Sequence, residues 1–175
     1  MRPDRNYSYR PVTEADFGLL RGWLASPHMA RWWGDADEAL AEISTHLAAG
    51  STVEAFIVSL DGAPFGYIQS YDMDREIDHP YAPQPARTFG IDQSIGIEAL
   101  TGKGHGPAMM KAFCDRLFAA GASRIITDPE TTNDYAIRAY EKAGFRKDRI
   151  ITSDYGTVWL MTLERRAGRS EGQSQ

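Results

Sequence analysis

The sequence predicts a mixed α/β (α+β) fold, because strand-like and helix-like segments alternate along its 175 residues. Three observations support this prediction. Short apolar strands alternate with amphipathic helical patterns, an Asp-Gly pair marks a hairpin in the first half, and a glycine-rich stretch separates a strand from a helix in the second half. We expect one domain over residues 1–166 and a disordered tail over residues 167–175.

The first third of the chain predicts a strand, two helices and an irregular connection between the helices. The strand covers residues 7–12, the helices cover 13–26 and 37–50, and the connection covers 26–37. Thr13 can cap the first helix, with Asp16 three residues later. In the second helix an apolar stripe continues to Leu47, and Gly50 is placed to end it.

The rest of the chain predicts a hairpin, a loop and a second α/β half. The hairpin, the loop and the next strand are residues 54–73, 74–87 and 88–96. The loop is acidic and then proline-rich, which is typical of an exposed connection. There follow a helix from Pro107, a strand over 123–129, a helix from Asn133 to Gly144, and two strands over 148–165 that turn at Tyr155-Gly156.

Charge and cysteine content exclude several classes of function. A net charge of −5 and a pI near 5.4 argue against nucleic acid as a partner and favour a cationic small molecule. Cys114 is the only cysteine, so no intramolecular disulfide forms and we expect a cytoplasmic protein. No segment reads as a signal peptide or a membrane span. The four histidines show no metal-ligand spacing, so we expect no metal.

Three glycines at alternate positions, Gly102, Gly104 and Gly106, directly precede a helical pattern. Bare backbone at a helix N-terminus lets a phosphate approach N–H groups that have no intrahelical partner. Pro107 suits the first helical turn. The pattern fits neither a Walker A loop nor a dinucleotide fingerprint. We therefore interpret it as a pyrophosphate-binding loop, and the alternative is a merely flexible turn.

Residues after the next strand narrow this interpretation. Asn133, Ala136, Tyr140 and the run YEKAGF follow the loop, and together they resemble the GNAT superfamily of acetyl-CoA-dependent N-acetyltransferases over essentially the whole chain. The resemblance implies a twisted mixed, mostly antiparallel sheet of six to seven strands flanked by helices. It also implies acetyl-CoA as co-substrate, bound through backbone amides of the glycine loop.

The resemblance implies a set of coenzyme-binding residues. They are Gly102, Lys103, Gly104, His105, Gly106, Pro107, Asn133, Ala136 and Tyr140. Asn133 is also placed to cap its helix. The family usually has Arg or Gln at the position of Thr101, so one phosphate contact is expected to be weaker here.

Within the superfamily, the motifs RWWGD, GYIQSYDM, FGIDQSIG and TGKGHG occur in an order similar to the aminoglycoside 6′-N-acetyltransferases. This implies acetyl transfer to the 6′-amine of an aminoglycoside antibiotic, by direct attack in a ternary complex and by a monomer or weak homodimer. The similarity is weak across residues 72–88. Alternatives are acetylation of a siderophore precursor or of a protein amine, and a non-catalytic module that senses acetyl-CoA.

Two residues are candidates for catalysis. Asp92 is a carboxylate inside an apolar strand, and such a group needs a partner or a purpose. The resemblance implies that it is the base, acting directly or through water, whereas the alternative is an Asp that bonds to backbone at a bulge. Tyr140 is implied to protonate the departing thiolate, and the alternative is a core tyrosine. Cys114 reads as a buried apolar filler, which disfavours covalent acetyl-cysteine catalysis.

The resemblance also implies residues that bind the acceptor. They are Trp32, Trp33, Gln69, Tyr71, Asp92, Asp128 and Asp154. Carboxylates there would complement a polycationic sugar. The alternatives are turn or capping roles for Asp128 and Asp154, and simple packing of the two tryptophans onto the core. The acidic residues between 72 and 78 read as solvated surface, so we assign them no role.

Overall fold

The structure, a computed structural model, describes residues 6–76, 78–153 and 156–165. Within these ranges seven strands form one sheet in the order β1-β2-β3-β4-β5-β7-β6. The strands are β1 Tyr7–Pro11, β2 Val53–Leu60, β3 Ala63–Asp72, β4 Thr88–Ile95, β5 Arg124–Thr127, β6 Arg146–Ser153 and β7 Gly156–Glu164. All neighbours are antiparallel except β4 and β5, which are parallel. The predicted fold class and strand number are confirmed.

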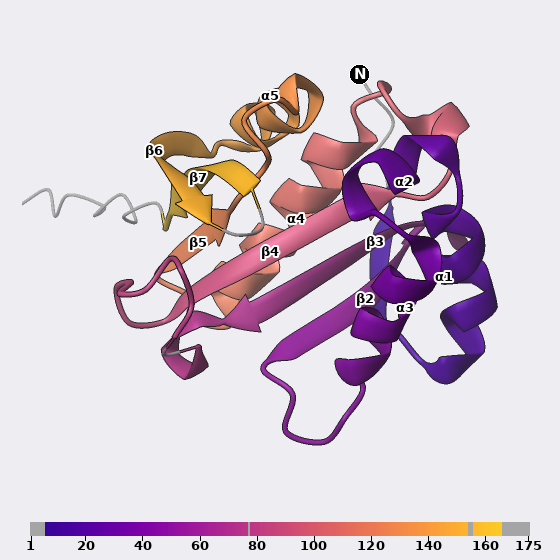
Figure 1. Ribbon diagram of the computed structural model, residues 1–175, viewed down its shortest axis with the longest axis horizontal. Helices are drawn as coiled ribbons and strands as arrows, with labels where there is room; N and C mark the ends of the chain where they lie inside the picture. The colour runs from indigo at the N-terminus through magenta and orange to yellow at the C-terminus, as the bar shows by residue number, and fades with distance from the viewer. Residues whose placement is uncertain (1–5, 77, 154–155, 166–175) are drawn as a thin grey trace, which may run out of the picture.

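Helices cover both faces of this sheet (Figure 1). They are α1 Phe17–Leu24, α2 Pro27–Trp33, α3 Ala36–Thr45, α4 His105–Ala119 and α5 Asp134–Ala143. Ile57 and Tyr67 pack with α1, α2 and α3, whereas their strand neighbours Val58 and Ile68 pack with α4 and α5. This division follows from the alternation of side chains along a strand, and it places one apolar core on each face.

Strands β4 and β5 part early, and this opens the sheet. Their ladder joins only Thr88–Gly90 to Arg124–Ile126. Strand β4 continues to Ile95, while β5 ends at Thr127 and the chain leaves toward α5. The second half of β4 therefore has one paired edge, toward β3, and one edge that faces the opening. Backbone N–H and C=O groups at such an edge need other partners.

Several local predictions are confirmed. The N–H and the hydroxyl of Thr13 both donate to the carboxylate of Asp16, so these residues do start the first helical segment. The hairpin turns at Asp61-Gly62, where φ is 50° and 86°. Positive values at both central residues are what a type I′ turn requires. Gly144 ends α5 with a φ of 106°.

Three predicted boundaries are wrong. The connection predicted as irregular contains α2, seven residues that start at a proline and bury Met29. Such a short helix is held by tertiary packing and leaves little periodic signal. Helix α3 ends at Thr45, so Leu47 lies beyond it and is 37% exposed. Helix α4 begins at His105, two residues before the predicted start.

The loop over residues 74–87 is irregular as predicted, after a single 3-10 turn at Met73–Arg75. Its acidic residues are tied to backbone and side chains. Asp74 accepts from the Arg87 N–H at 2.9 Å, and Glu76 accepts from the Thr52 hydroxyl. The prediction of an exposed loop is wrong for Tyr81, which is only 7% exposed.

The ring of Tyr71 lies over Gly90, beside the opening between β4 and β5. A Cβ atom at Gly90 would lie 1.9 Å from Cζ of Tyr71, so the ring occupies the space that any side chain would need. Tyr71 packs there with Met73, Tyr81 and Ile126 in a cluster below the end of β5. The absence of a side chain at Gly90 thus allows this cluster to pack beneath the opening.

We predict that Gly90→Ala destabilises the fold by about 3 kcal/mol, because the ring of Tyr71 must move out of a packed cluster. Urea unfolding followed by circular dichroism measures the change. Gly18→Ala is the matched control, since a Cβ atom at Gly18 of α1 meets nothing within 4 Å. Equal stability of the two variants would contradict the prediction.

Candidate active site

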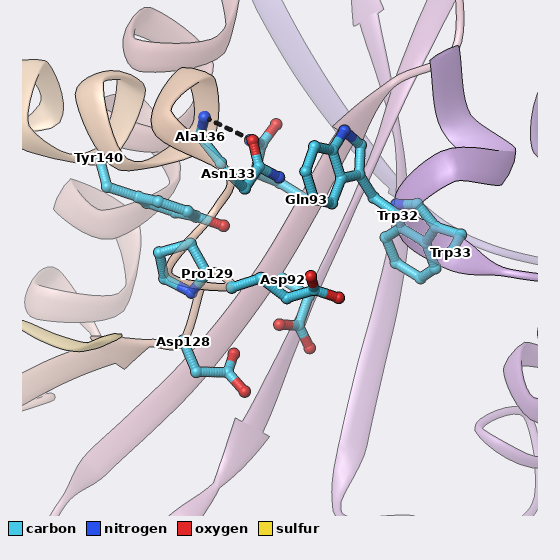
Figure 2. A pocket seen from close by; sticks show the side chains of 10 residues that line it. Trp32, Trp33, Asp92, Gln93, Asp128, Pro129, Asn133, Ala136 and Tyr140 are labelled. Atoms are coloured by element: carbon cyan, nitrogen blue, oxygen red, sulfur yellow. Dashed lines mark hydrogen bonds between the residues drawn. The ribbon is translucent and has the colours of Figure 1, made fainter. Parts of the chain in front are cut away.

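Two adjoining cavities occupy the opening between β4 and β5. The smaller, of about 230 Å³, is shown in Figure 2, and the larger measures about 390 Å³. The two cavities share five lining residues, which are Trp32, Trp33, Gln93, Asn133 and Ala136. The smaller cavity adds carboxylates and Tyr140, whereas the larger one extends along β4 to the glycine loop. Two ligands bound in them would therefore meet at the shared wall.

The glycine loop forms the far end of the larger cavity. Gly104, Gly106 and Pro107 line it, at the N-terminus of α4. The positive end of a helix dipole favours an anion at this position. A Cβ atom at Gly106 would come no nearer than 3.8 Å to Ile95, so packing within the protein does not require the glycine. The space that a Cβ atom of Gly106 would fill therefore belongs to the larger cavity.

The side chains of the loop have different positions. His105 is buried, and its Nδ1 lies 2.9 Å from the hydroxyl of Tyr7. Its imidazole therefore belongs to the core, and the backbone is what His105 presents at the helix start. Lys103 is exposed and is not among the residues that line either cavity. The N–H of Gly102 donates to the hydroxyl of Tyr135, a cavity residue that sequence reasoning missed.

Asn133 begins α5 at the wall between the cavities. Its Oδ1 accepts from the N–H of Ala136 at 3.0 Å, so the predicted helix cap is confirmed (Figure 2). The open edge of β4 lies across from it. There the carbonyl of Ile95 accepts from Nε2 of His28 on α2 at 2.8 Å. His28 was not singled out from the sequence, because the contact joins residues 67 positions apart.

Asp92 and Asp128 form a half-buried carboxyl pair at the bottom of the smaller cavity. Asp92 is on the open half of β4, and Asp128 directly follows β5. The two carboxyl groups are close enough for a hydrogen bond between them. Oδ2 of Asp92 accepts from Nε2 of Gln69 at 2.8 Å, and Oδ2 of Asp128 accepts from the hydroxyl of Tyr81. Each acid thus has one neutral donor from a neighbouring segment.

Burial raises the pKa of both acids. For Asp128 burial is the largest cause and the charge of Asp92 adds to it, which raises the pKa of Asp128 to about 7. Burial also raises the pKa of Asp92, although its bond from Gln69 opposes this. Two carboxyl groups in direct contact titrate as a pair, so the pair keeps a proton up to a higher pH than two separate carboxyl groups would. Such a pair can accept a proton from a bound amine.

Tyr140 faces the same cavity from α5 (Figure 2). It is buried, its ring meets that of Phe145 edge-on at 5.5 Å, and its hydroxyl lies beside the side chains of Thr127 and Gln93. Burial and the charge of Asp92 raise the pKa of Tyr140. The phenol therefore stays protonated at neutral pH and can donate a proton.

The two tryptophans line the side of the pocket opposite Tyr140 (Figure 2). Both are half-buried residues at the end of α2. The ring of Trp33 meets that of Tyr67 edge-on at 5.7 Å, and the guanidinium of Arg31 lies 4.8 Å from the ring centre of Trp32. Both rings form a cavity wall, and Trp33 also packs onto the core, so for Trp33 the two readings from the sequence are compatible.

Some of the expected acceptor residues do not line a cavity. Gln69 and Tyr71 are buried behind Asp92, and Gln69 reaches the site only through its hydrogen bond to that acid. Asp154 lies outside the described residues. Conversely, the exposed Glu130 lines the smaller cavity, and sequence reasoning missed it. Its position two residues after Asp128, at the end of a strand, was the available signal.

The remaining sequence expectations concern Cys114, metal ions and membrane spans. Cys114 is buried in the core under α4, and burial raises its pKa to about 12, so the prediction of an apolar filler is confirmed. Within the described residues, no cluster of three or more His, Cys, Asp or Glu could hold a metal ion. No described helix is both long and apolar enough to cross a membrane.

Comparison with known proteins agrees with this geometry. A family model described as an acetyltransferase (GNAT) domain matches residues 12–153. An aminoglycoside N(6′)-acetyltransferase type 1 from Klebsiella pneumoniae is 34% identical over 166 residues, which are 90% of this chain and 83% of that protein. An N-hydroxyputrescine acetyltransferase from Acinetobacter baumannii is 26% identical over 89% of this chain and 73% of its own length.

Solved structures give the same result. The crystal structure of the aminoglycoside acetyltransferase AAC(6′)-Ib with coenzyme A and kanamycin matches with a TM-score of 0.80 and 30% identity, over 92% of this chain and 96% of the other. The family model spans most of the chain, and the fold and the glycine loop at the start of α4 are those that the resemblance implied. The chain therefore belongs to the GNAT acetyltransferase family.

Proposed function

We propose that this protein transfers the acetyl group of acetyl-CoA to the 6′-amine of aminoglycoside antibiotics and so confers resistance to them. The observation that carries the proposal is the half-buried Asp92–Asp128 pair, which faces a cavity that joins a second cavity ending at the glycine loop. A carboxyl pair suits a cationic amine, and a helix N-terminus suits a phosphate. The 34% identical relative is an aminoglycoside N(6′)-acetyltransferase.

The residues of the larger cavity fit coenzyme A. The backbone of Gly104 and Gly106 at the start of α4 would hold the pyrophosphate, and Asn133 and Ala136 would flank the arm that leads to the thiol. Unpaired backbone groups on the open edge of β4 suit the amides of that arm. Acetyl-CoA supplies the acyl thioester, and the chain supplies its position.

The residues of the smaller cavity fit the chemistry of acyl transfer. Asp92 takes a proton from the ammonium group, directly or through water, and leaves a neutral amine. The amine nitrogen then attacks the carbonyl carbon of the thioester, the carbon–sulfur bond breaks, and Tyr140 gives its proton to the thiolate. The nitrogen loses its second proton as the amide forms, and this proton, relayed through water, restores the phenol of Tyr140. Backbone N–H groups on the open half of β4 steady the charge that develops on the carbonyl oxygen. Asp128 completes the negative site for the amine.

A siderophore precursor is a second candidate acceptor. The observation in its favour is the similarity to an N-hydroxyputrescine acetyltransferase, at 26% identity. Such a substrate carries one amine on an aliphatic chain and needs less negative charge than an aminoglycoside. A screen of kanamycin, tobramycin, N-hydroxyputrescine and a lysine peptide, with thiol release as the readout, separates these acceptors. Coenzyme binding without turnover on any of them would indicate a sensor instead.

We predict that Asp92→Asn lowers kcat/KM for kanamycin by about 10² to 10⁴-fold, the usual contribution of a general base. Thiol release at saturating acetyl-CoA measures it. Asp115→Asn is the matched control, because Asp115 is exposed on α4, where its carboxylate pairs with Lys111 at 2.7 Å, and it lines neither cavity. Wild-type activity in Asp92→Asn would contradict the role of this acid.

We predict that Gly106→Ala weakens binding of coenzyme A about tenfold or more, because a methyl group enters the space above the helix N-terminus. The fold should be unharmed or stabilised by about 0.5–1 kcal/mol, since alanine favours a helix. Calorimetric titration and thermal unfolding measure the two effects. Gly22→Ala in α1 makes the same helical exchange in open space and should leave affinity unchanged. Unchanged affinity in Gly106→Ala would contradict this placement of the phosphate.

We predict that Glu130→Gln raises KM about two- to fivefold for kanamycin, in the range of an exposed charge contact of up to about 1 kcal/mol. A substrate with a single amine should be affected less, because its only ammonium group lies at the carboxyl pair and no second one is left to contact Glu130. The ratio of the two KM changes is the measurement. Glu141→Gln on the outer face of α5 is the control, and equal KM changes for both substrates would contradict a role in recognition.

A further inference from the structure

The loop over residues 74–87 places one side chain against the carboxyl pair. The hydroxyl of Tyr81 donates to Oδ2 of Asp128, although 47 residues separate them in sequence. Tyr81 is 7% exposed in a segment whose composition is that of a surface loop. The mechanism described above gives this contact no task.

The position of Tyr81 is fixed by contacts on both sides. Its ring lies 4.6 Å from that of His79, which in turn stacks on Tyr71 at 5.5 Å between ring centres. Its carbonyl accepts from Nε2 of Gln84 at 2.7 Å. Further hydrogen bonds tie the end of the loop to the body of the protein; they join Arg87 to Asp74 and Ala120, and Ser123 to Ala86. The phenol is therefore held in place by its surroundings.

The direction of this hydrogen bond decides what it does. Burial and the neighbouring Asp128 raise the pKa of Tyr81, so its hydroxyl stays protonated and acts as the donor. A donor stabilises a carboxylate more than a carboxylic acid, and this bond lowers the pKa of Asp128. The other groups that act on Asp128 are Asp92 on β4, Tyr71 on β3 and Tyr140 on α5. Of these, the charge of Asp92 has the opposite effect.

We propose that Tyr81 is a positioning residue that holds the carboxyl group of Asp128 beside Asp92 and favours its ionised form, so that a bound cationic amine meets two carboxylates. The proposal rests on the proposed function for the identity of the amine. Tyr81 does for Asp128 what Gln69 does for Asp92, since each supplies one neutral donor from a different segment. Because neither donor is charged, the pair keeps its attraction for a cation.

The first test is a titration of the free protein, which needs no turnover. The carboxyl carbon of Asp128 is followed by ¹³C NMR against pH and is identified by its absence in Asp128→Asn. In Tyr81→Phe its midpoint should move up by about one pH unit, the size expected for loss of one hydrogen bond to a charged group. Tyr9→Phe is the matched control, because it loses a phenol that donates to the carbonyl of Met109, away from the pair.

The second test is the pH profile of kcat/KM with kanamycin. In Tyr81→Phe the acidic limb should move to higher pH by the same amount, because Asp128 ionises at a higher pH without this hydrogen bond. On the plateau above this limb the variant should equal the wild type within about twofold. A loss of similar size at every pH would mean that Tyr81 only supports the loop, and it would overturn the proposal.

The outcomes separate the two proposals. An unchanged NMR midpoint in Tyr81→Phe overturns the role of Tyr81 whatever the activity. A wild-type protein that acetylates no amine overturns the proposed function, while the NMR midpoint still decides the role of Tyr81. If Tyr81→Phe does not fold, 3-fluorotyrosine at position 81 replaces it. Its phenol is a stronger donor and should move the midpoint down, and no movement would again overturn the proposal.

Discussion

The early separation of β4 and β5 is the constraint on which the site depends. A ladder that ends at Gly90 and Ile126 leaves the second half of β4 with backbone groups directed into the opening. Those groups need partners, and His28 takes one of them in the free protein. The same separation exposes Asp92 on one side and Asp128 on the other, so a single backbone feature provides both the room and the chemical groups.

Two half-buried carboxyl groups in contact destabilise the fold, and their surroundings show how this destabilisation is limited. A cation beside them would offset the repulsion, but it would also cancel the charge that attracts an amine. Neutral donors avoid this conflict: Gln69 bonds to Asp92, and Tyr81 bonds to Asp128. A proton that the pair retains relieves the remaining repulsion. The repulsion between the two acids thus lowers the stability of the free protein, and a bound cation offsets that repulsion.

Local features were predictable from the sequence, and features that depend on distant contacts were not. Asn133 as a cap, the Asp61-Gly62 turn and the unusual carboxylate Asp92 each follow from a few neighbouring residues. The contact of Tyr81 with Asp128 depends on how a proline-rich loop folds back, which no local pattern encodes. The core position of the His105 imidazole likewise depends on β1, 98 residues earlier at Tyr7.

The site must hold an anionic coenzyme next to its own carboxylates, in a chain whose net charge is −5. Dipoles solve this problem better than a general positive surface, because their field falls off within the first turn of the helix. The glycine loop at α4 favours the anion locally, and the uncharged residues Gln93, Asn133 and Ala136 stand between it and the carboxyl pair. The long-range field can then remain negative and attract a polycationic acceptor. Net charge and coenzyme affinity are therefore set by different parts of the molecule.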